Sequence, residues 1–524
     1  MTYRMKGPIK ASTRLLSLLL ALSLSFFSLA DAAEPHAGKE EGANEEKSIP
    51  EPTAFITQHS GVFNGKKINY TVTAGETYLQ NKDGNPKASI FSFAYTKKGP
   101  ANANRPVTFV WNGGPGSASV WLHIGSFGPK RVSVPSNAQY PGPPPYSVLT
   151  APETILDVTD LVFVDPVGTG YSTALGEHEN SEFWGLNEDA ESMAEFIRDW
   201  STANGRWNAP RFLLGESFGT TRAAAVADVL QSDMNISLNG LIFVSQALDY
   251  AGSSPYMSNN LISYITYLPT MAAAALHHKK ISPAPESTES FLRDARRFAT
   301  DELLPALFNG NQLGSEQRAQ VAERLAWFTG LSPEYIERAN LRVNGFSFAK
   351  ELLRDQGLAL GLLDARYTRD DIDDLESQPE SDAAGDAISA AFQAAMRSYM
   401  HTDLKIDWNR LYKSPSDDEL GDKWRWRTVP DDSGWEPWPV NTAGDLVRAL
   451  RVNPSLQVMV ASGYHDLVTP FFDAEYTLNR HGIKQGRVEY HYYTGGHMMY
   501  VHEPSRTDLL NDVRAFVTRQ LGIE

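Results

Sequence analysis

Residues 215–219 read Gly-Glu-Ser-Phe-Gly and fit the pattern G-x-S-x-G. The apolar run 212–214 precedes them, and the alanine-rich segment 220–230, made of good helix formers, follows them. A buried strand, a tight turn and a helix in this order hold a serine hydroxyl on a strained turn above a parallel sheet. The helix N-terminus behind it favours negative charge that develops on a substrate. We therefore predict that Ser217 is a nucleophile. The alternative is a chance match, because the pattern fixes only three positions.

A serine nucleophile needs a base that takes its proton and an acid that orients the base. The apolar run 456–461 is followed by Ser-Gly-Tyr-His-Asp, which ends at Asp466. The alternating run 488–493 is followed by Thr-Gly-Gly-His, which ends at His497. Both residues lie just past the expected ends of strands, where a parallel sheet collects its catalytic groups. We predict that His497 is the base and Asp466 the orienting acid.

The glycine-rich turn 112–116, Asn-Gly-Gly-Pro-Gly, follows the apolar run 107–111. It lacks the Lys-Ser/Thr that ends a phosphate-binding loop. The tetrahedral intermediate of acyl transfer needs two fixed backbone N–H groups. One comes from the residue after the nucleophile, Phe218, and the other from a glycine-rich loop after an earlier strand, here Gly114. We predict this oxyanion hole, the alternative being an ordinary tight turn.

The elements that must position these residues follow from the hydrophobic pattern. Alternating runs in 53–98, separated by a turn at 81–85, predict antiparallel strands at one edge of a sheet. The helical spacing of 187–200, with acidic residues in its first half, predicts a helix. Short apolar runs predict buried strands at 107–111, 161–164, 212–214, 241–244 and 456–461, and the alternating run predicts another at 488–493.

The segment 251–454 has mostly helical patterning and no convincing buried strand. About 200 residues are therefore inserted between two neighbouring strands of one core. We predict an α/β fold with a mostly parallel central sheet, helices on both faces and a large helical insertion, or cap. The core would comprise 53–250 and 455–524, and the insertion 251–454.

The composition excludes several classes of partner. The chain has 524 residues, and its 42% hydrophobic and 21% charged residues are ordinary for a globular protein. A net charge of −16 argues against nucleic acid or an anionic membrane surface as partner. There is no cysteine, so disulfides and a cysteine-linked lipid are excluded. An exported protein of this kind suits a bacterial periplasm or exterior.

The N-terminus predicts export. Four basic residues lie among the first fourteen, an apolar stretch follows at 15–29, and the next residues are Ala-Asp-Ala. This pattern is typical of a signal peptide, 1–32, cut before Ala33. The alternative is a membrane anchor, for which the apolar run is short. The acidic, polar segment 33–52 predicts a disordered leader.

Other chemistry-bearing residues have simpler interpretations. His465 adjoins Asp466, and a base bound to its own neighbour could not also reach Ser217, so we assign it to the loop. His277 and His278 are adjacent and cannot share a helix face as metal ligands do, so we expect no metal site and no cofactor. Four tryptophans could line a substrate cleft or pack the insertion onto the core: Trp424, Trp426, Trp435 and Trp438.

Taken together, these stretches resemble the serine carboxypeptidase family. The blocks occur in the family's order and span most of the chain from about residue 50, and the Asn-Gly-Gly-Pro-Gly block is quite specific to the family. The helical insertion is only weakly similar. The resemblance lies in Trp-Asn-Gly-Gly-Pro-Gly-Ser at 111–117, Asp-Pro-Val-Gly-Thr-Gly-Tyr-Ser at 165–172, Gly-Glu-Ser-Phe-Gly at 215–219, Gly-Tyr-His-Asp-Leu-Val-Thr-Pro at 463–470 and Gly-Gly-His-Met at 495–498.

The resemblance implies an α/β-hydrolase fold and an enzyme that removes residues one at a time from the C-terminus of a peptide. It gives Ser217, Asp466 and His497 the roles of nucleophile, acid and base, and Gly114 and Phe218 those of the oxyanion donors. It further implies that the terminal carboxylate of the substrate is bound by Asn112 and Glu216. Two carboxyl groups in close contact cannot both stay ionised, so such a site works best at acid pH.

The sequence departs from the family pattern at three positions. Ser117 replaces a frequent cysteine, and Phe218 replaces a more common tyrosine. Ser126 stands where the family places a second Glu before a Gly-Pro. The nearby Lys130 and Arg131 could serve instead, or could be solvated surface.

Two further interpretations of the function stay open, and Ser126 suggests the first of them. One is an esterase or acyltransferase with the same triad, which would be indifferent to a free terminal carboxylate. The other is a non-catalytic binding protein on a hydrolase scaffold, which would need a triad member to be absent or misplaced.

Overall fold

The computed structural model describes residues 49–99, 104–254, 260–414, 418–426 and 439–522, together with 429 and 434. The predicted signal peptide, 1–32, and the leader up to residue 48 lie outside the described residues. Trp435 and Trp438 also lie outside them.

The central element of the described residues is a ten-stranded sheet in the order β1-β2-β3-β7-β4-β9-β10-β13-β14, with β8 paired to β3. The first strands, β1 to β3, are antiparallel and form one edge, and β3 pairs antiparallel with β7. From β7 to β14 the strands are parallel. The strands are β1 (Ala54–Phe63), β2 (Lys66–Gln80), β3 (Pro86–Lys97), β4 (Val107–Trp111), β7 (Asp160–Asp165), β8 (Thr173–Ala174), β9 (Arg211–Ser217), β10 (Gly240–Gln246), β13 (Gln457–Gly463) and β14 (Val488–Tyr493).

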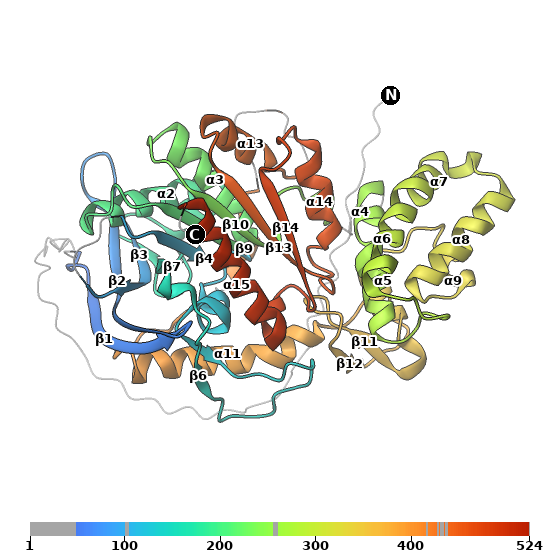
Figure 1. Ribbon diagram of the computed structural model, residues 1–524, viewed down its shortest axis with the longest axis horizontal. Coiled ribbons are helices and arrows are strands. Elements are labelled where there is room, and N and C mark those ends of the chain that lie inside the picture. Colours follow the sequence, from blue (N-terminus) through green and yellow to red (C-terminus); the bar gives the residue numbers. More distant parts are fainter. Residues whose placement is uncertain are drawn as a thin grey trace, which may run out of the picture. The chain divides into compact units, whose positions relative to one another are not determined.

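Successive residues of the parallel strands alternate between two apolar cores, because side chains on a strand point to opposite faces. Leu213 and Phe243 face a core that includes side chains of α2 (Leu186–Ala203), α3 (Phe218–Ser232) and α13 (Ala443–Val452). Leu214 and Ile242 face the core that includes α11 (Ala383–Thr402) and α15 (Glu503–Gln520). In Figure 1, α15 crosses in front of the strands. This layered arrangement, with a mostly parallel sheet between helices, confirms the predicted α/β-hydrolase fold.

The segment between β10 and β13 is rich in helices among its described residues. Its first helices surround an apolar core of their own, and the side chains of Leu467 and Phe471, from the segment that follows β13, also belong to this core. In Figure 1 these helices form a group beside α14 (Phe471–Arg480). The described helices of the whole segment are α4 (Leu261–Thr266), α5 (Leu268–His277), α6 (Thr288–Phe298), α7 (Leu304–Asn309), α8 (Ser315–Thr329), α9 (Pro333–Arg338), α10 (Gly345–Glu351), α11, α12 (Asp418–Lys423) and α13, of which α11 packs into the core that it shares with α15 and not into this group.

A short hairpin, β11 (Leu358–Leu360) and β12 (Thr368–Asp370), lies within this helical segment. We did not predict a strand in this segment, because strands of three residues are too short to establish a period of two. A second small hairpin, β5 (Lys130–Val132) with β6 (Val148–Thr150), lies in the proline-rich stretch after β4. The chain between β4 and β5 forms α1 (Val120–Leu122) and the π-helical turn η1 (His123–Phe127).

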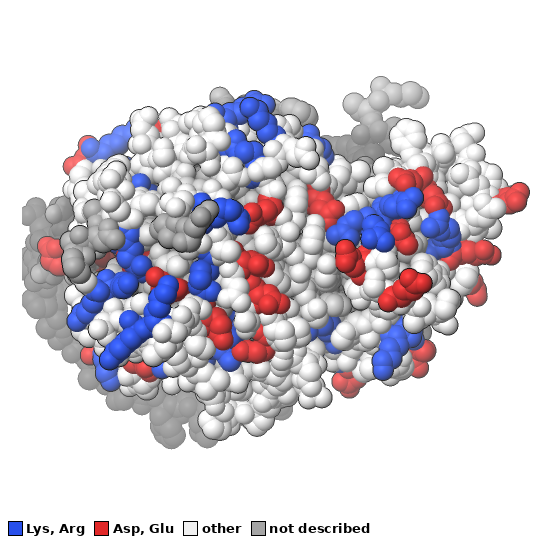
Figure 2. All heavy atoms as spheres, in the orientation of Figure 1, with Lys and Arg blue, Asp and Glu red and all other residues white. Residues whose placement is uncertain are grey.

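On the face shown in Figure 2, basic and acidic side chains are interspersed and do not gather in one large patch of either sign. In the part of the chain that the structure describes, no helix is both long enough and apolar enough to cross a bilayer.

Candidate active site

Ser217 lies at the junction of β9 and α3, with φ 60° and ψ −130°. A positive φ is costly for a residue with a side chain, and it persists only where the surroundings enforce it. Gly215 and Gly219 allow the turn to close, because a Cβ on Gly215 would collide with the carbonyl oxygen of Gly219. A Cβ on Gly219 would lie 3.0 Å from the carbonyl oxygen of Trp111, at the end of β4. The sequence motif thus forms the strained turn that a nucleophile elbow requires.

Asp466 and His497 follow the ends of β13 and β14, and the structure joins them by a hydrogen bond of 2.8 Å between Oδ2 of Asp466 and Nδ1 of His497. Both side chains are buried. A bond at Nδ1 leaves Nε2 as the nitrogen that can take a proton, as in a Ser-His-Asp triad. The loops that carry the two residues touch, since a Cβ on Gly463 would collide with the carbonyl oxygen of Gly496.

The side chain of Thr469 contacts both Asp466 and His497, and we did not predict this role from the sequence. Its hydroxyl donates to Oδ2 of Asp466 at 2.7 Å and lies 3.2 Å from Nδ1 of His497. The other oxygen of Asp466 accepts the backbone N–H groups of Val468 and Thr469 at 2.8 and 2.9 Å. These donated bonds fix the orientation of the Asp466 carboxyl group, which can therefore hold the imidazole in place. An Asp followed by a hydroxyl residue at the third position was the available sequence signal.

The core of the protein holds the main chain of His497, and neighbouring charges act on its side chain. Its carbonyl oxygen accepts the hydroxyl of Ser245, at the end of β10, at 2.7 Å. Burial by itself lowers the pKa of the imidazole, but the negative charge of Asp466, with smaller contributions from Glu216 and Asp382, raises the pKa above its ordinary value. The base is therefore near enough to these three carboxyl groups to be charged more easily than a free histidine.

The glycine-rich loop 112–116 lies directly against the elbow. A Cβ on Gly113 would lie 2.5 Å from the backbone nitrogen of Phe218 and 2.6 Å from the carbonyl oxygen of Glu216. Gly114 follows with φ 110°, a conformation that glycine adopts readily. The predicted oxyanion donors, the N–H groups of Gly114 and Phe218, thus belong to two backbone segments in close contact at the N-terminus of α3.

Glu216 precedes the nucleophile, and its buried carboxyl group is enclosed by two donors. Asn112 donates to Oε2 at 2.5 Å, and the hydroxyl of Tyr500 lies 3.0 and 2.9 Å from Oε1 and Oε2. Burial raises the pKa of Glu216 to about 7, although the hydrogen bonds and the charge of His497 oppose the increase. The structure therefore joins Asn112 and Glu216, the two residues that the resemblance assigns to the terminal carboxylate, and adds a phenol.

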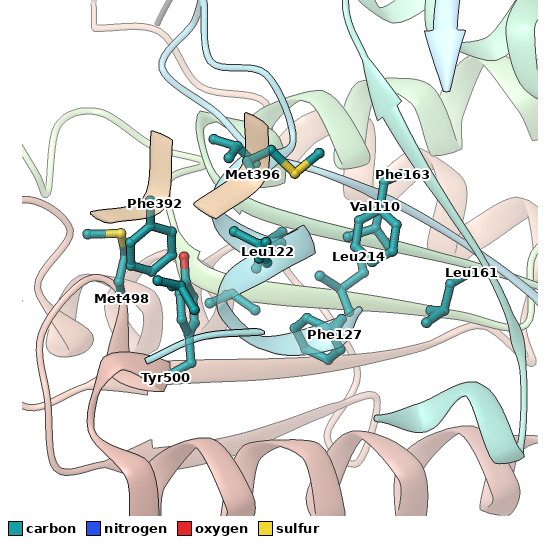
Figure 3. Packing of buried hydrophobic residues seen from close by; sticks show 14 of the residues in the cluster. Val110, Leu122, Phe127, Leu161, Phe163, Leu214, Phe392, Met396, Met498 and Tyr500 are labelled. Carbon is teal, nitrogen blue, oxygen red and sulfur yellow. The ribbon is translucent and has the colours of Figure 1, made fainter. Parts of the chain in front are cut away.

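Tyr500 lies three residues after His497, and no motif pointed to it. It is buried beside Phe392 and near Met498 in the cluster shown in Figure 3. A Cβ on Gly125 would lie 2.7 Å from its ring. The aromatic contacts fix the ring, and the ring brings its hydroxyl to Glu216.

Ser126 does not complete a carboxyl pair with Glu216. It is fully buried in η1, and its hydroxyl donates to the carbonyl oxygen of Leu122 at 3.2 Å. The side chains of the neighbouring cations are engaged elsewhere, Arg131 with Glu503 at 3.0 Å and Lys130 with Thr150. The hydrogen-bonding partners of Glu216 come from other segments of the chain.

The tryptophans and the other histidines that the sequence singled out do not belong to the triad. Phe218 packs edge-on against Trp424 and Trp426, with ring centroids 5.2 and 5.8 Å apart, so these two tryptophans pack the late insertion onto the elbow helix. His465 is buried with its ring 5.4 Å from that of His277, and burial lowers its pKa to about 3. In the described part of the chain, no group of three or more His, Asp or Glu side chains is arranged to hold a metal.

Part of the chain matches the model of a known protein family. The model of the serine carboxypeptidase family matches residues 66–295, which include the glycine-rich loop, Glu216 and Ser217. This match confirms the resemblance and supports a serine peptidase. No curated protein sequence gives a significant match.

Similar solved structures have low identity and low TM-scores. A haloalkane dehalogenase loop variant from Bradyrhizobium elkanii is 14% identical, with 90% of this chain and 99% of that chain covered and a TM-score of 0.32. A juvenile hormone epoxide hydrolase from the silkworm Bombyx mori is 12% identical, with coverages of 86% and 80% and a TM-score of 0.31. An enantioselective mutant of an epoxide hydrolase from Aspergillus niger is 11% identical, with coverages of 85% and 78% and a TM-score of 0.31.

Proposed function

Because this chain resembles the serine carboxypeptidases over residues 66–295, we propose that it is an exported serine carboxypeptidase that releases C-terminal amino acids from peptides. The observation that carries the proposal is the buried carboxyl group of Glu216, which directly precedes Ser217 and is hydrogen-bonded by Asn112 and Tyr500. A buried acid at this position can donate a hydrogen bond to a substrate carboxylate when it is protonated.

The reaction proceeds through an acyl-enzyme. Ser217 attacks the carbonyl carbon of the last peptide bond while Nε2 of His497 takes the hydroxyl proton. Asp466 holds the imidazole tautomer and stabilises the imidazolium that forms. The N–H groups of Gly114 and Phe218 bind the oxyanion. His497 then protonates the leaving amine, and water, activated by the same base, hydrolyses the ester on Ser217.

Glu216 recognises the terminal carboxylate of the substrate. With a pKa of about 7, its carboxyl group is protonated in acidic solution. A protonated Glu216 donates a hydrogen bond to a carboxylate, whereas an ionised one repels it. Binding of a peptide with a free C-terminus is therefore expected to weaken as the pH rises through about 7.

The test compares three substrates from pH 4 to 8: an N-blocked dipeptide, the same dipeptide as its C-terminal amide, and an aryl ester. Ser217→Ala provides the catalytic control, and Glu216→Gln, which keeps the shape of the side chain, provides the recognition control. Fast release from the free acid, slow release from the amide and loss of both in Ser217→Ala support the proposal.

Equal rates on the acid and the amide, or turnover of the ester alone, would refute the exopeptidase function. Such a result would favour an esterase or acyltransferase. Ser126, which donates its hydroxyl back to Leu122, is the observation that favours this second function, because it leaves Glu216 without a second acid. Absence of Ser217-dependent turnover of all three substrates would favour a binding protein.

A further inference from the structure

The loop 361–367 joins β11 and β12 of the helical insertion and contacts the loop that carries the acid. The backbone N–H of Leu467 donates to the carbonyl oxygen of Leu362 at 2.9 Å. The N–H of Ala365 donates to the carbonyl oxygen of His465 at 2.9 Å. These two bonds flank Asp466 in the sequence, so the insertion fixes the main chain on both sides of the acid.

The same loop also contacts the base. The backbone N–H of His497 donates to the carbonyl oxygen of Leu363 at 2.5 Å. A Cβ on Gly496 would collide with this carbonyl oxygen, so the two segments are in direct contact. Because Ser245 holds the carbonyl oxygen of His497 from the core, the base is fixed at one end by the core and at the other by the insertion.

Asp382 holds the loop in this position. Its Oδ1 accepts the backbone N–H groups of Leu362 at 2.7 Å and of Leu363 at 3.3 Å. The same carboxyl group is the N-cap of α11, since it accepts the N–H groups of Ala384 and Gly385 at 3.3 and 3.1 Å. One side chain therefore connects the start of a twenty-residue helix to the loop that binds the triad.

We infer that Asp382 is a positioning residue of the active site, which places the Leu363 carbonyl against the main chain of His497. The inference rests on the triad of the proposed function and not on its carboxypeptidase specificity. It gives the loop 361–367 of the insertion a part in positioning the base.

The charge of Asp382 also acts on His497. Three carboxyl groups act on the imidazole by their negative charge and raise the pKa of His497: Asp466 from the acid loop, Glu216 from the elbow and Asp382 from the insertion. Removal of one negative charge must lower this pKa. A protonated base cannot accept the proton of Ser217, so the labelling rate falls at acid pH. This fall, the acid limb of the pH profile, would then move to lower pH.

The test measures the rate at which a fluorophosphonate labels Ser217 in the full chain, from pH 4 to 9, so that it does not depend on any peptide specificity. Asp382→Asn keeps the oxygen that accepts from Leu362 and removes the charge. Asp382→Ala removes both. Ser332→Ala is the matched control, because it removes the N-cap of another helix of the insertion, α9, through the loss of its bond from Tyr335.

In Asp382→Asn we expect the plateau rate of Ser217 labelling to lie within about threefold of the wild-type rate. The acid limb of its pH profile should lie at lower pH than that of the wild type. Asp382→Ala should lose about tenfold or more at the plateau, and Ser332→Ala should match the wild type in both plateau and limb. A wild-type plateau and limb in Asp382→Ala would overturn the inference. If Asp382→Ala does not fold, Asp382→Ser replaces it, because serine can still cap α11 but is too short to hold Leu362, and a wild-type plateau in Asp382→Ser would overturn the inference.

Labelling that follows these expectations without any turnover of the free-acid dipeptide would support the inference while refuting the carboxypeptidase function.

Discussion

Replacing Glu216 by Gln removes a buried acid while preserving its shape and its oxygen acceptor. The consequence for stability follows from the pKa, which burial raises from 4.5 to about 7 in the folded protein. Between these pH values the unfolded chain releases the proton and the folded protein keeps it. The folded state thus binds more protons, and the free energy of unfolding of the wild type decreases as the pH rises from about 4.5 to about 7.

The size of this decrease can be worked out. Each unit by which a pKa differs between the two states corresponds to about 1.4 kcal/mol, so a pKa difference of about 2.5 gives about 3 kcal/mol. The charge of His497 interacts with Glu216, so the two groups share the change. Glu216→Gln lacks the acid, and its stability relative to the wild type should increase by about 2–3 kcal/mol from pH 4.5 to 7.5.

Urea unfolding at half-unit steps from pH 4.5 to 8 measures this difference. Asp473→Asn is the matched control, because burial raises the pKa of Asp473 to about 8 and the residue lies on α14, outside the triad and the carboxylate site. Both variants should gain stability over the wild type as the pH rises. Only Glu216→Gln should change KM for the free-acid dipeptide, making it independent of pH above 7, where the wild-type KM increases by up to about tenfold per unit.

The reasoning fails at one of two points. If wild type and Glu216→Gln lose stability in parallel across this range, Glu216 is not protonated in the folded protein. If the stability difference appears but KM for the free acid changes equally with pH in both proteins, Glu216 is buried but does not contact the substrate carboxylate.

Three further changes test other parts of the site. Tyr500→Phe removes a hydrogen bond that favours the ionised form of Glu216, so the rise of KM for the free-acid dipeptide should move to higher pH, with fluorophosphonate labelling unchanged; a KM profile that matches the wild type at every pH would remove Tyr500 from the proposed carboxylate site. Thr469→Val removes the hydroxyl that binds Asp466 and should lower kcat about tenfold at constant KM, as steady-state kinetics on the amide and the acid will show. Gly113→Ala places a Cβ within 2.5 Å of the elbow backbone and should reduce kcat about 100-fold, with a normal circular dichroism spectrum excluding global unfolding.

The fold could be predicted because its signals are local. The strands at 107–111, 161–164 and 488–493 are short, strongly apolar or alternating, and each ends in a glycine-rich or polar turn, so a short window identifies both the strand and its end. The chain order of the expected nucleophile, acid and base then places them at the same edge of a parallel sheet. The structure joins Asp466 and His497 there by a hydrogen bond.

The partners that the sequence did not indicate come from elements whose positions depend on the whole fold. Thr469 follows Asp466 closely, and a turn could suggest it. Tyr500 reaches Glu216 only because η1 and α11 fix its ring, and the Leu363 carbonyl is a backbone group of a hairpin loop in the insertion. A backbone carbonyl carries no residue type, so no motif can single it out.

Glu216 is hydrogen-bonded by an amide and a phenol and not by a second acid, and this changes the pH range in which we expect activity. Two neighbouring carboxyl groups cannot both ionise, and their repulsion keeps one of them protonated far above its ordinary pKa. In this chain Glu216 instead meets donors, Asn112 and Tyr500, which lower its pKa against the effect of burial, so that it loses its proton near pH 7. Protonation of Glu216 also removes a charge that raises the pKa of His497, so the base stays neutral to a lower pH whenever the carboxylate site is protonated. The free-acid optimum should therefore lie just below neutrality, limited on one side by the base and on the other by Glu216.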